Sequence, residues 1–182
     1  MQRTQGWLVA IALGGVAAAG TFAIARSASL GRGVRIDLGG IAKGFAVDRA
    51  SELLAPVGPS LVNAGGDIAA TGEWIVGVDK EGEPLALALV DGALATSGRD
   101  RRRWLRDGEE RHHLIDPSTG RPAESDLLRV TAFAATAVEA EVIAKTRFLV
   151  GFDRAVEEAD DVGAPCVLVA QDGRCALAGG LA

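Results

Sequence analysis

Three short segments of this chain combine glycine turns with side chains that can handle a phosphate group. They are residues 36–44, which include Lys43, residues 63–68, and residues 113–120, which begin with His113. Glycines let a backbone approach a bound group closely, and the free N–H groups at the start of a helix attract anions. Lysine adds a positive charge, and histidine suits proton transfer near neutral pH. The pattern favours a diphosphate site with proton-transfer chemistry beside it.

The first two segments each have a functional and a structural interpretation. Asp37 is placed to accept hydrogen bonds from a ribose or an adenine amine, or to act as an ordinary turn or N-terminal cap. Asn63 and Asp67 flank a Gly-Gly pair that includes Gly66, so both side chains can face one pocket. The alternative for this second segment is a tight hairpin turn.

The third segment is the more specific of the three. His113, Asp116 and Thr119 follow one another at a spacing of three around a proline-fixed bend, which gathers an imidazole, a carboxylate and a hydroxyl. The alternative is a packed strand histidine followed by a plain β-turn. His112 is expected to point to the opposite face of its strand and is the weaker candidate of the two histidines.

These segments must be positioned by helices and strands, and the sequence patterns predict an α+β fold with helices packed on a mainly antiparallel sheet. Apolar spacing and helix-stop residues predict helices over 41–54, 136–150 and 153–161. Strands are predicted at 34–38, 61–63, 73–78, 85–90, 94–96, 112–115 and 129–133, and a closing hairpin pairs 166–170 with 174–177.

Composition excludes several classes of function. The chain has 182 residues, 48% of them hydrophobic, and a formal net charge of −5 without a basic stripe, so nucleic acid is not expected as a partner. The arginine-rich run at 99–106 is interpreted as a solvated loop, or else as a surface for a phosphate or an acidic partner. Cys166 and Cys175 flank a hairpin turn out of register, which predicts no disulfide, and the pattern of cysteines excludes a thiolate zinc site.

The N-terminal residues 1–26 contain an uncharged run from Trp7 to Ala25, flanked by Arg3 and Arg26. Such a run is typical of a signal peptide or of a membrane anchor, and a buried helix is the remaining alternative. It predicts export to the extracytoplasmic face of a membrane.

Four motifs together resemble the FAD:protein FMN transferase (ApbE) family. They are DLGGIAKG from residue 37, NAGGD from 63, TSG from 96 and HLIDPSTG from 113, and the likeness extends from about residue 34 through 182. The resemblance implies an ApbE-like fold and transfer of FMN from FAD to a Thr or Ser hydroxyl of a redox protein. It also implies release of AMP, use of Mg²⁺ and a place outside the cytoplasm of a bacterium.

The resemblance also assigns roles to residues. His113 matches the histidine near the reacting centre and Asp116 lies in the same motif. The positions matching those that contact FAD or line its pocket are Asp37, Lys43, Asn63, Gly66, Asp67, Thr96, Ser97, His113 and Thr119. Gly40 and Glu141 match metal-binding positions.

The chain departs from the family in the helix that holds the metal. Where the family has an Asp and a Thr, this chain has Glu141 and Lys145, and an ammonium has no acceptor for a metal. Either Lys145 places its charge where the ion would lie, or the two residues form an ordinary helix pair on a solvated face. The chain also has an apolar run where the family has more than a hundred residues, which predicts a partial domain over 34–182. A catalytically impaired flavin-binding paralogue and a membrane-anchored structural module are therefore the alternatives to the transferase.

Overall fold

The computed structural model describes residues 38–80 and 83–181 of the chain. Three predictions therefore lie outside the described residues: the apolar N-terminal run, Asp37, and the strand at 34–38 except for its last residue, Leu38. Within the described part, the structure has no helix that is both long and apolar enough to span a membrane.

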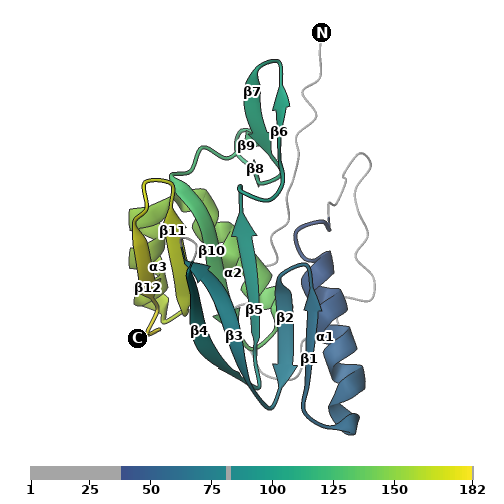
Figure 1. The fold of residues 1–182 in the computed structure, drawn as a ribbon. Coiled ribbons are helices and arrows are strands. Elements are labelled where there is room, and N and C mark those ends of the chain that lie inside the picture. The colour runs from purple at the N-terminus through teal and green to yellow at the C-terminus, as the bar shows by residue number, and fades with distance from the viewer. Residues whose placement is uncertain (1–37, 81–82, 182) are drawn as a thin grey trace.

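A six-stranded sheet forms the centre of the fold, and all of its neighbouring strands run antiparallel (Figure 1). Its order is β1 (Ser60–Ala64), β2 (Asp67–Thr71), β5 (Ala93–Gly98), β10 (Leu127–Ala134), β11 (Cys166–Ala170) and β12 (Cys175–Ala178). The middle strands are rich in valine, leucine and alanine because both of their faces are covered, and β11 is buried at every position.

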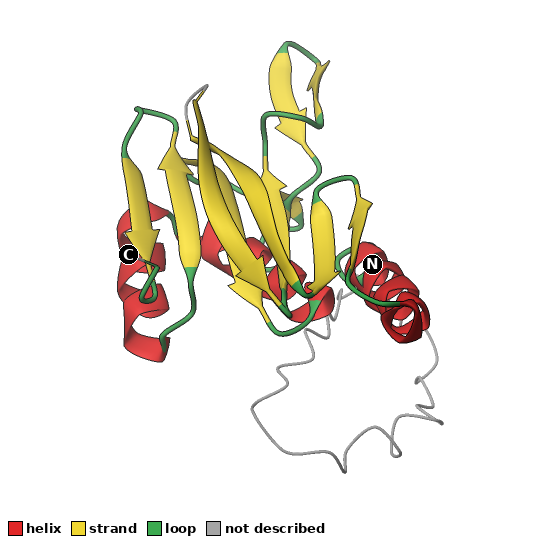
Figure 2. Cartoon of the chain, turned by 60° about the horizontal axis from the view of Figure 1, so that its bottom comes forward, coloured by secondary structure: helices red, strands yellow, loops and turns green. Residues whose placement is uncertain are grey.

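The helices α1 (Ala42–Leu54), α2 (Ala137–Val150) and α3 (Phe152–Val162) cover one face of this sheet (Figure 2). Thr136 caps α2 by accepting a hydrogen bond from the Glu139 N–H, and Gly151 ends the helix with a φ of 85°. A short 3-10 turn, Ala55–Val57, closes α1. The main core lies where Phe148 and Ala144 of α2 meet Val130 and Leu168 of the sheet.

Three two-stranded hairpins complete the fold: β3 (Glu73–Lys80) with β4 (Glu83–Val90), β6 (Arg103–Arg106) with β7 (Glu109–His112), and β8 (Ile115–Asp116) with β9 (Arg121–Pro122). Val76 and Leu89 of the first hairpin pack on Ala70 and Leu94, on the sheet face away from the helices (Figure 1). The second hairpin projects beyond the end of the sheet.

The α+β class, the mainly antiparallel sheet and the three helices agree with the sequence predictions. Two local predictions were wrong. Part of the arginine-rich run is strand β6, because its residues pair with β7. The predicted strand at 112–115 is instead the end of β7 and the start of β8, separated by a bend. The two cysteines form no disulfide, as expected from the register, which pairs Cys166 with Ala178 and Cys175 with Val169.

Candidate active site

The candidate site lies where the first turn of α1 meets α2, and each helix caps the start of the other. No side chain of α1's own N-terminus caps that helix, and the Gly44 N–H instead donates to Glu141 Oε2 at 3.0 Å. In return, the carboxylate of Asp48 in α1 accepts hydrogen bonds from the Ala137 and Val138 N–H groups at 2.7 and 3.0 Å. Carboxylates at helix N-termini are favourable because they satisfy free N–H groups and meet the positive end of the helix dipole.

Gly44 allows this crossing. A Cβ at this position would lie 2.8 Å from the carbonyl carbon and oxygen of Ala137, closer than side chains approach backbone. Gly44, the last glycine of the first motif, therefore allows two helices to cross closely. The close approach of α1 to α2 at the site therefore depends on a glycine at position 44.

Four charged groups gather at this crossing. Lys43 Nζ lies 2.5 Å from Asp67 Oδ2 and 3.8 Å from Glu141 Oε1, while Lys145 Nζ lies 2.8 Å from the same Glu141 oxygen. Both carboxylate side chains are 1% exposed, whereas those of Lys43 and Lys145 are 37% and 27% exposed. The two carboxylates thus form a buried floor, and the two lysines lie between that floor and solvent.

Burial shifts the ionisation of this group. Desolvation raises the pKa of Asp67 against the opposing effect of the Lys43 hydrogen bond and charge. Desolvation likewise lowers the pKa of Lys145, and its hydrogen bond to Glu141 opposes that shift. The buried Oδ1 of Asp67 has no hydrogen-bond partner among the described residues. An additional donor at that oxygen would satisfy a polar atom that is otherwise costly to bury.

The second motif forms a tight turn, and Asp67 is the first residue of the strand that follows it. Register pairs Ala64 with Asp67, which leaves Gly65 and Gly66 at the tip with φ values of 65° and 100°. Asn63 Oδ1 accepts a hydrogen bond from the Gly66 N–H at 3.0 Å. The motif is therefore a tight hairpin turn, as its structural interpretation predicted, and the same turn starts the strand that carries Asp67.

Thr96 and Ser97 lie on β5, in the centre of the sheet. The Thr96 hydroxyl is 2.8 Å from that of Thr131 on the neighbouring strand, and Ser97 is buried. Successive strand residues point to opposite faces, so these two hydroxyls do not share one surface. No hydrogen bond within the described residues joins either of them to the four charged groups.

His113 follows β7 and is exposed, with Nδ1 3.4 Å from the carbonyl oxygen of Arg102. Desolvation lowers its pKa, the hydrogen bond to the Arg102 carbonyl opposes that shift, and the charge of Arg102 and, least of all, that of Lys145 lower it further. His112 points the other way, as expected: it is buried, its Nε2 lies 3.1 Å from the Ala123 carbonyl oxygen, and its ring meets Phe148 edge to face.

Asp116 and Thr119 have local roles. Asp116 Oδ1 accepts from the N–H and the hydroxyl of Ser118 at 2.8 and 2.7 Å, and these bonds lower its pKa. Thr119 Oγ1 accepts from the Arg121 N–H at 3.2 Å. Among the described residues no hydrogen bond joins either side chain to His113.

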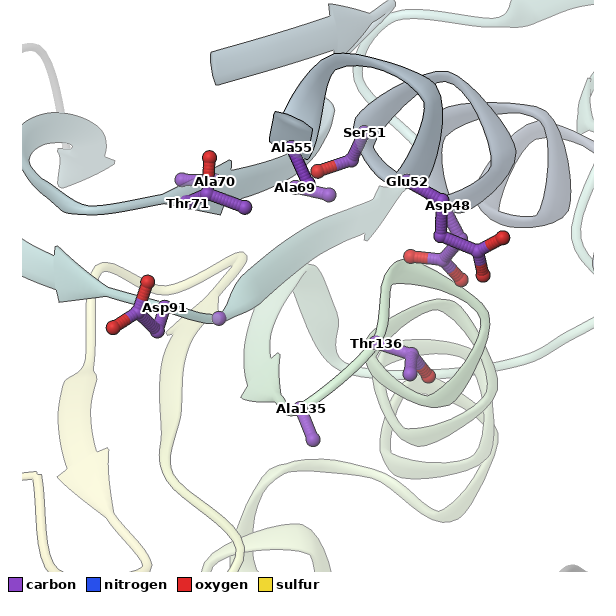
Figure 3. Close-up of a pocket in the computed structure, with 11 residues that line it drawn as sticks. Asp48, Ser51, Glu52, Ala55, Ala69, Ala70, Thr71, Asp91, Ala135 and Thr136 are labelled. Atoms are coloured by element: carbon purple, nitrogen blue, oxygen red, sulfur yellow. The ribbon is translucent and has the colours of Figure 1, made fainter. Parts of the chain in front are cut away.

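A pocket lies between α1, the end of β2 and the residues that precede β5 and α2 (Figure 3). It is lined by Asp48, Ser51, Glu52, Ala55, Ala69, Ala70, Thr71, Asp91, Gly92, Ala135 and Thr136. Asp48 was not among the predicted site residues, because an aspartate in the middle of a helix is common on a solvated face. Its capping of another helix, far along the chain, has no local sequence signal.

The predicted metal-binding residues both lie against Lys145. A Cβ on Gly40 would be 3.8 Å from Lys145 Cδ, and the ammonium contacts Glu141. Both oxygens of Glu141 already accept bonds, one from the lysine and one from the Gly44 N–H. No group of three metal-ligating side chains occurs among the described residues. Two ammonium groups beside one engaged carboxylate do not fit Mg²⁺, which prefers several oxygen ligands.

Comparison with known sequences gives one consistent result. A sequence model of the ApbE family matches residues 10–168. A Treponema pallidum protein named FAD:protein FMN transferase is 37% identical over 143 residues, which are 67% of this chain and 40% of that protein. The Escherichia coli K12 protein of the same name is 32% identical over 151 residues, 76% of this chain and 43% of its own length. The chain thus spans about two fifths of the length of these curated relatives.

Solved structures agree. The crystal structure of the ApbE protein from Thermotoga maritima is similar with a TM-score of 0.71 and 35% identity, covering 81% of this chain and 52% of that one. The apo form of the flavinyl transferase ApbE from Pseudomonas stutzeri gives a TM-score of 0.71 at 24% identity, covering 80% and 50%. The second likeness supports the fold alone. The predicted ApbE-like fold is confirmed over the part of the chain that these structures cover.

Proposed function

Because this chain belongs to the ApbE family, we propose that it moves FMN from FAD to a Thr or Ser hydroxyl of an acceptor protein and releases AMP. The observation that carries the proposal is the meeting of Lys43 with Asp67, since each comes from a different glycine motif of the resemblance and the two ends lie 2.5 Å apart. Named relatives that match this chain are FAD:protein FMN transferases.

The reaction needs a neutralised diphosphate, an aligned nucleophile and a proton acceptor. The acceptor hydroxyl oxygen attacks the phosphorus of the FMN half, the bond from that phosphorus to the bridging oxygen breaks, and AMP leaves with that oxygen. His113 takes the hydroxyl proton. Its exposure leaves the ring accessible to an incoming side chain, and its lowered pKa keeps it in the neutral form that accepts a proton.

Lys43 faces the diphosphate in this proposal, and its partial exposure leaves ammonium protons free to reach an anion. In the first turn of α1, the Ala42 N–H donates to the Leu38 carbonyl oxygen and the Gly44 N–H donates to Glu141, so the Lys43 side chain is the main anion-binding group of this turn. Asn63, Gly66, Thr96, Ser97 and Thr119 remain proposed contacts of the flavin dinucleotide. We also propose that the acceptor is a redox protein, that the protein acts outside the cytoplasm and that the N-terminal run directs it to the membrane.

The alternative is a flavin-binding paralogue that does not transfer FMN. The Lys145 ammonium at the predicted metal position favours it, since a site altered there has lost the ligand set implied by the resemblance. The two functions differ in one observable: the paralogue binds FAD and releases it unchanged on denaturation, whereas the transferase leaves FMN on the acceptor and AMP in solution.

The test is to incubate the full chain with FAD and a Ser/Thr-containing acceptor domain, with Mg²⁺ and separately with EDTA. A fluorescent acceptor band in a denaturing gel, together with equimolar AMP, is the expected result. An acceptor whose target hydroxyl is replaced by alanine is the matched control and should stay dark. His113→Ala should abolish the band. Full transfer by that variant would show that His113 is not the proton acceptor. The absence of a band in both buffers would contradict the transferase and favour the flavin-binding paralogue.

A further inference from the structure

We propose that the ammonium of Lys145, together with that of Lys43, provides the fixed positive charge of this site, so that the diphosphate is bound without a divalent cation. This inference rests on the proposed function for its ligand.

Lys145 occupies the space between the two predicted metal ligands. Its stem lies against Gly40, where a Cβ would be 3.8 and 3.9 Å from the two last methylene carbons, and its Nζ lies 2.8 Å from Glu141 Oε1. The side chain therefore passes from one predicted ligand to the other. A cation placed between Gly40 and Glu141 would have to displace the lysine or lie beside its charge.

The charges already balance without an ion. Two buried carboxylates, Asp67 and Glu141, face two ammonium groups, and Glu141 Oε1 contacts both lysines at 2.8 and 3.8 Å. Buried carboxylates require partners because an unpaired buried charge is costly. Here each carboxylate has an ammonium partner within 2.8 Å, so the two negative and two positive charges balance, and only Asp67 Oδ1 is left without a partner among the described residues.

The ammonium groups also retain donors. An ammonium has three N–H donors, and Lys145 donates one hydrogen bond to Glu141 while Lys43 donates one to Asp67. Their side chains are 27% and 37% exposed, in contrast to the 1% exposure of the carboxylates beneath them. The remaining donors can therefore reach an anion that arrives from solvent. This is the geometry expected of a phosphate site whose cations are fixed by the protein.

An ordinary helix pair does not account for the arrangement. Glu–Lys pairs at i,i+4 lie on solvated helix faces, whereas Glu141 is almost fully buried and also caps α1. The chain contains only three lysines, Lys43, Lys80 and Lys145, and two of them meet here. Lys80 lies exposed on β3, which makes it a matched control.

The first experiment measures metal binding with no flavin present. Mn²⁺ is titrated into the full-length protein and the free ion is followed by electron paramagnetic resonance. Wild type and Lys80→Ala should show no saturable binding at millimolar Mn²⁺. Lys145→Ala, which removes the charge and opens space beside Glu141, should gain one saturable site. Saturable binding by wild type that Glu141→Gln abolishes would overturn the proposal, as would a failure of folded Lys145→Ala to gain the site.

The second experiment measures affinity for FAD by fluorescence in EDTA and in Mg²⁺. Wild type should bind equally in both, within about twofold. Lys145→Met, which keeps the length of the stem but removes the charge, should lose about tenfold or more in EDTA, as expected for loss of a charge-assisted hydrogen bond. Lys80→Met should bind like wild type, and thermal unfolding confirms that each variant is folded.

The two experiments separate this inference from the proposed function. If wild type binds FAD only when Mg²⁺ is present, the fixed-cation inference is wrong while the transferase proposal stands. If wild type binds FAD in neither buffer, the proposed function fails, and the Mn²⁺ titration still decides whether Lys145 occupies the position of an ion.

Discussion

The N–H of Gly44 donates to Glu141 Oε2 at 3.0 Å, across 97 positions of the sequence. The other oxygen of the same carboxylate contacts Lys145. One buried side chain therefore joins the packing of α1 on α2 to the charge arrangement of the candidate site. Changes that separate the two helices should disturb the site, and changes that remove its charges should destabilise the helices.

Gly44→Ala should lower the free energy of unfolding. The added Cβ would meet the Ala137 carbonyl at 2.8 Å, and overpacking of this kind costs about 1–3 kcal/mol. Urea unfolding followed by circular dichroism measures the loss. Gly77→Ala is the control, because its Cβ would lie an ordinary 3.7 Å from Pro84, and it should change stability by less than about 0.5 kcal/mol. Equal effects of the two substitutions would contradict the close crossing of the helices.

Glu141→Ala should destabilise the protein by about 2–3 kcal/mol, since it leaves Lys145 partly buried without its partner and the Gly44 N–H without an acceptor. Glu157→Ala, on the exposed face of α3, should stay within about 0.5 kcal/mol of wild type. The comparison is made by the same urea unfolding. A loss for Glu141→Ala no larger than for the control would show that the buried carboxylate does not hold the helices together.

Local patterns in the sequence predicted much of the fold. Apolar spacing identified α1 from Ile41 and α2 after Thr136, and the alternation of short apolar runs with glycine turns identified the antiparallel sheet. These signals succeed because helix and strand periods are properties of neighbouring residues. The Gly65-Gly66 turn was likewise visible, since positive φ favours glycine.

The site was only partly predictable, because its side chains come from residues far apart in the sequence. The capping of α2 by Asp48 and of α1 by Glu141 joins residues 89 and 97 positions apart, and no window of sequence contains both partners. The hydrogen bonds that Ser118 donates to Asp116 within the same turn were likewise not predicted from the spacing of His113 and Asp116. Side chains that meet through tertiary packing give no periodic signal.

Cys166 should resist alkylation in the native protein. It is fully buried on β11, and burial raises the pKa of its thiol to about 11, so little reactive thiolate forms at neutral pH. Iodoacetamide followed by mass spectrometry should give at most one adduct, at the half-buried Cys175, and two adducts in urea. Native labelling of Cys166 at the rate seen in urea would contradict its place in the core.

Acid should destabilise the protein through His112. Burial lowers the pKa of this histidine below its ordinary value of 6.5, so the folded state holds it neutral while the unfolded state takes up a proton. Its contribution to stability is complete above pH 6.5 and is lost as the pH falls through the lower folded pKa. Urea midpoints between pH 7.5 and 5.5 measure the loss.

His112→Gln should flatten that dependence, because the amide can still donate to the Ala123 carbonyl but does not titrate. The chain has only two histidines, so His113→Asn in the same series separates their contributions. Retention of the full pH dependence by His112→Gln would assign it to other groups whose pKa the fold lowers, such as His113.

The rate of FMN transfer should rise with pH, and the midpoint of the rise should lie below the ordinary histidine pKa of 6.5. Desolvation, together with the charges of Arg102 and Lys145, lowers the pKa of His113, and only the neutral imidazole can accept the hydroxyl proton. Rates of acceptor labelling measured from pH 5 to 8 give the midpoint. Lys145→Met removes one of the charges that lower this pKa, so its midpoint should move to higher pH, whereas Lys80→Met should leave the midpoint unchanged. A midpoint that does not move in Lys145→Met would show that the charge of Lys145 does not lower the pKa of His113.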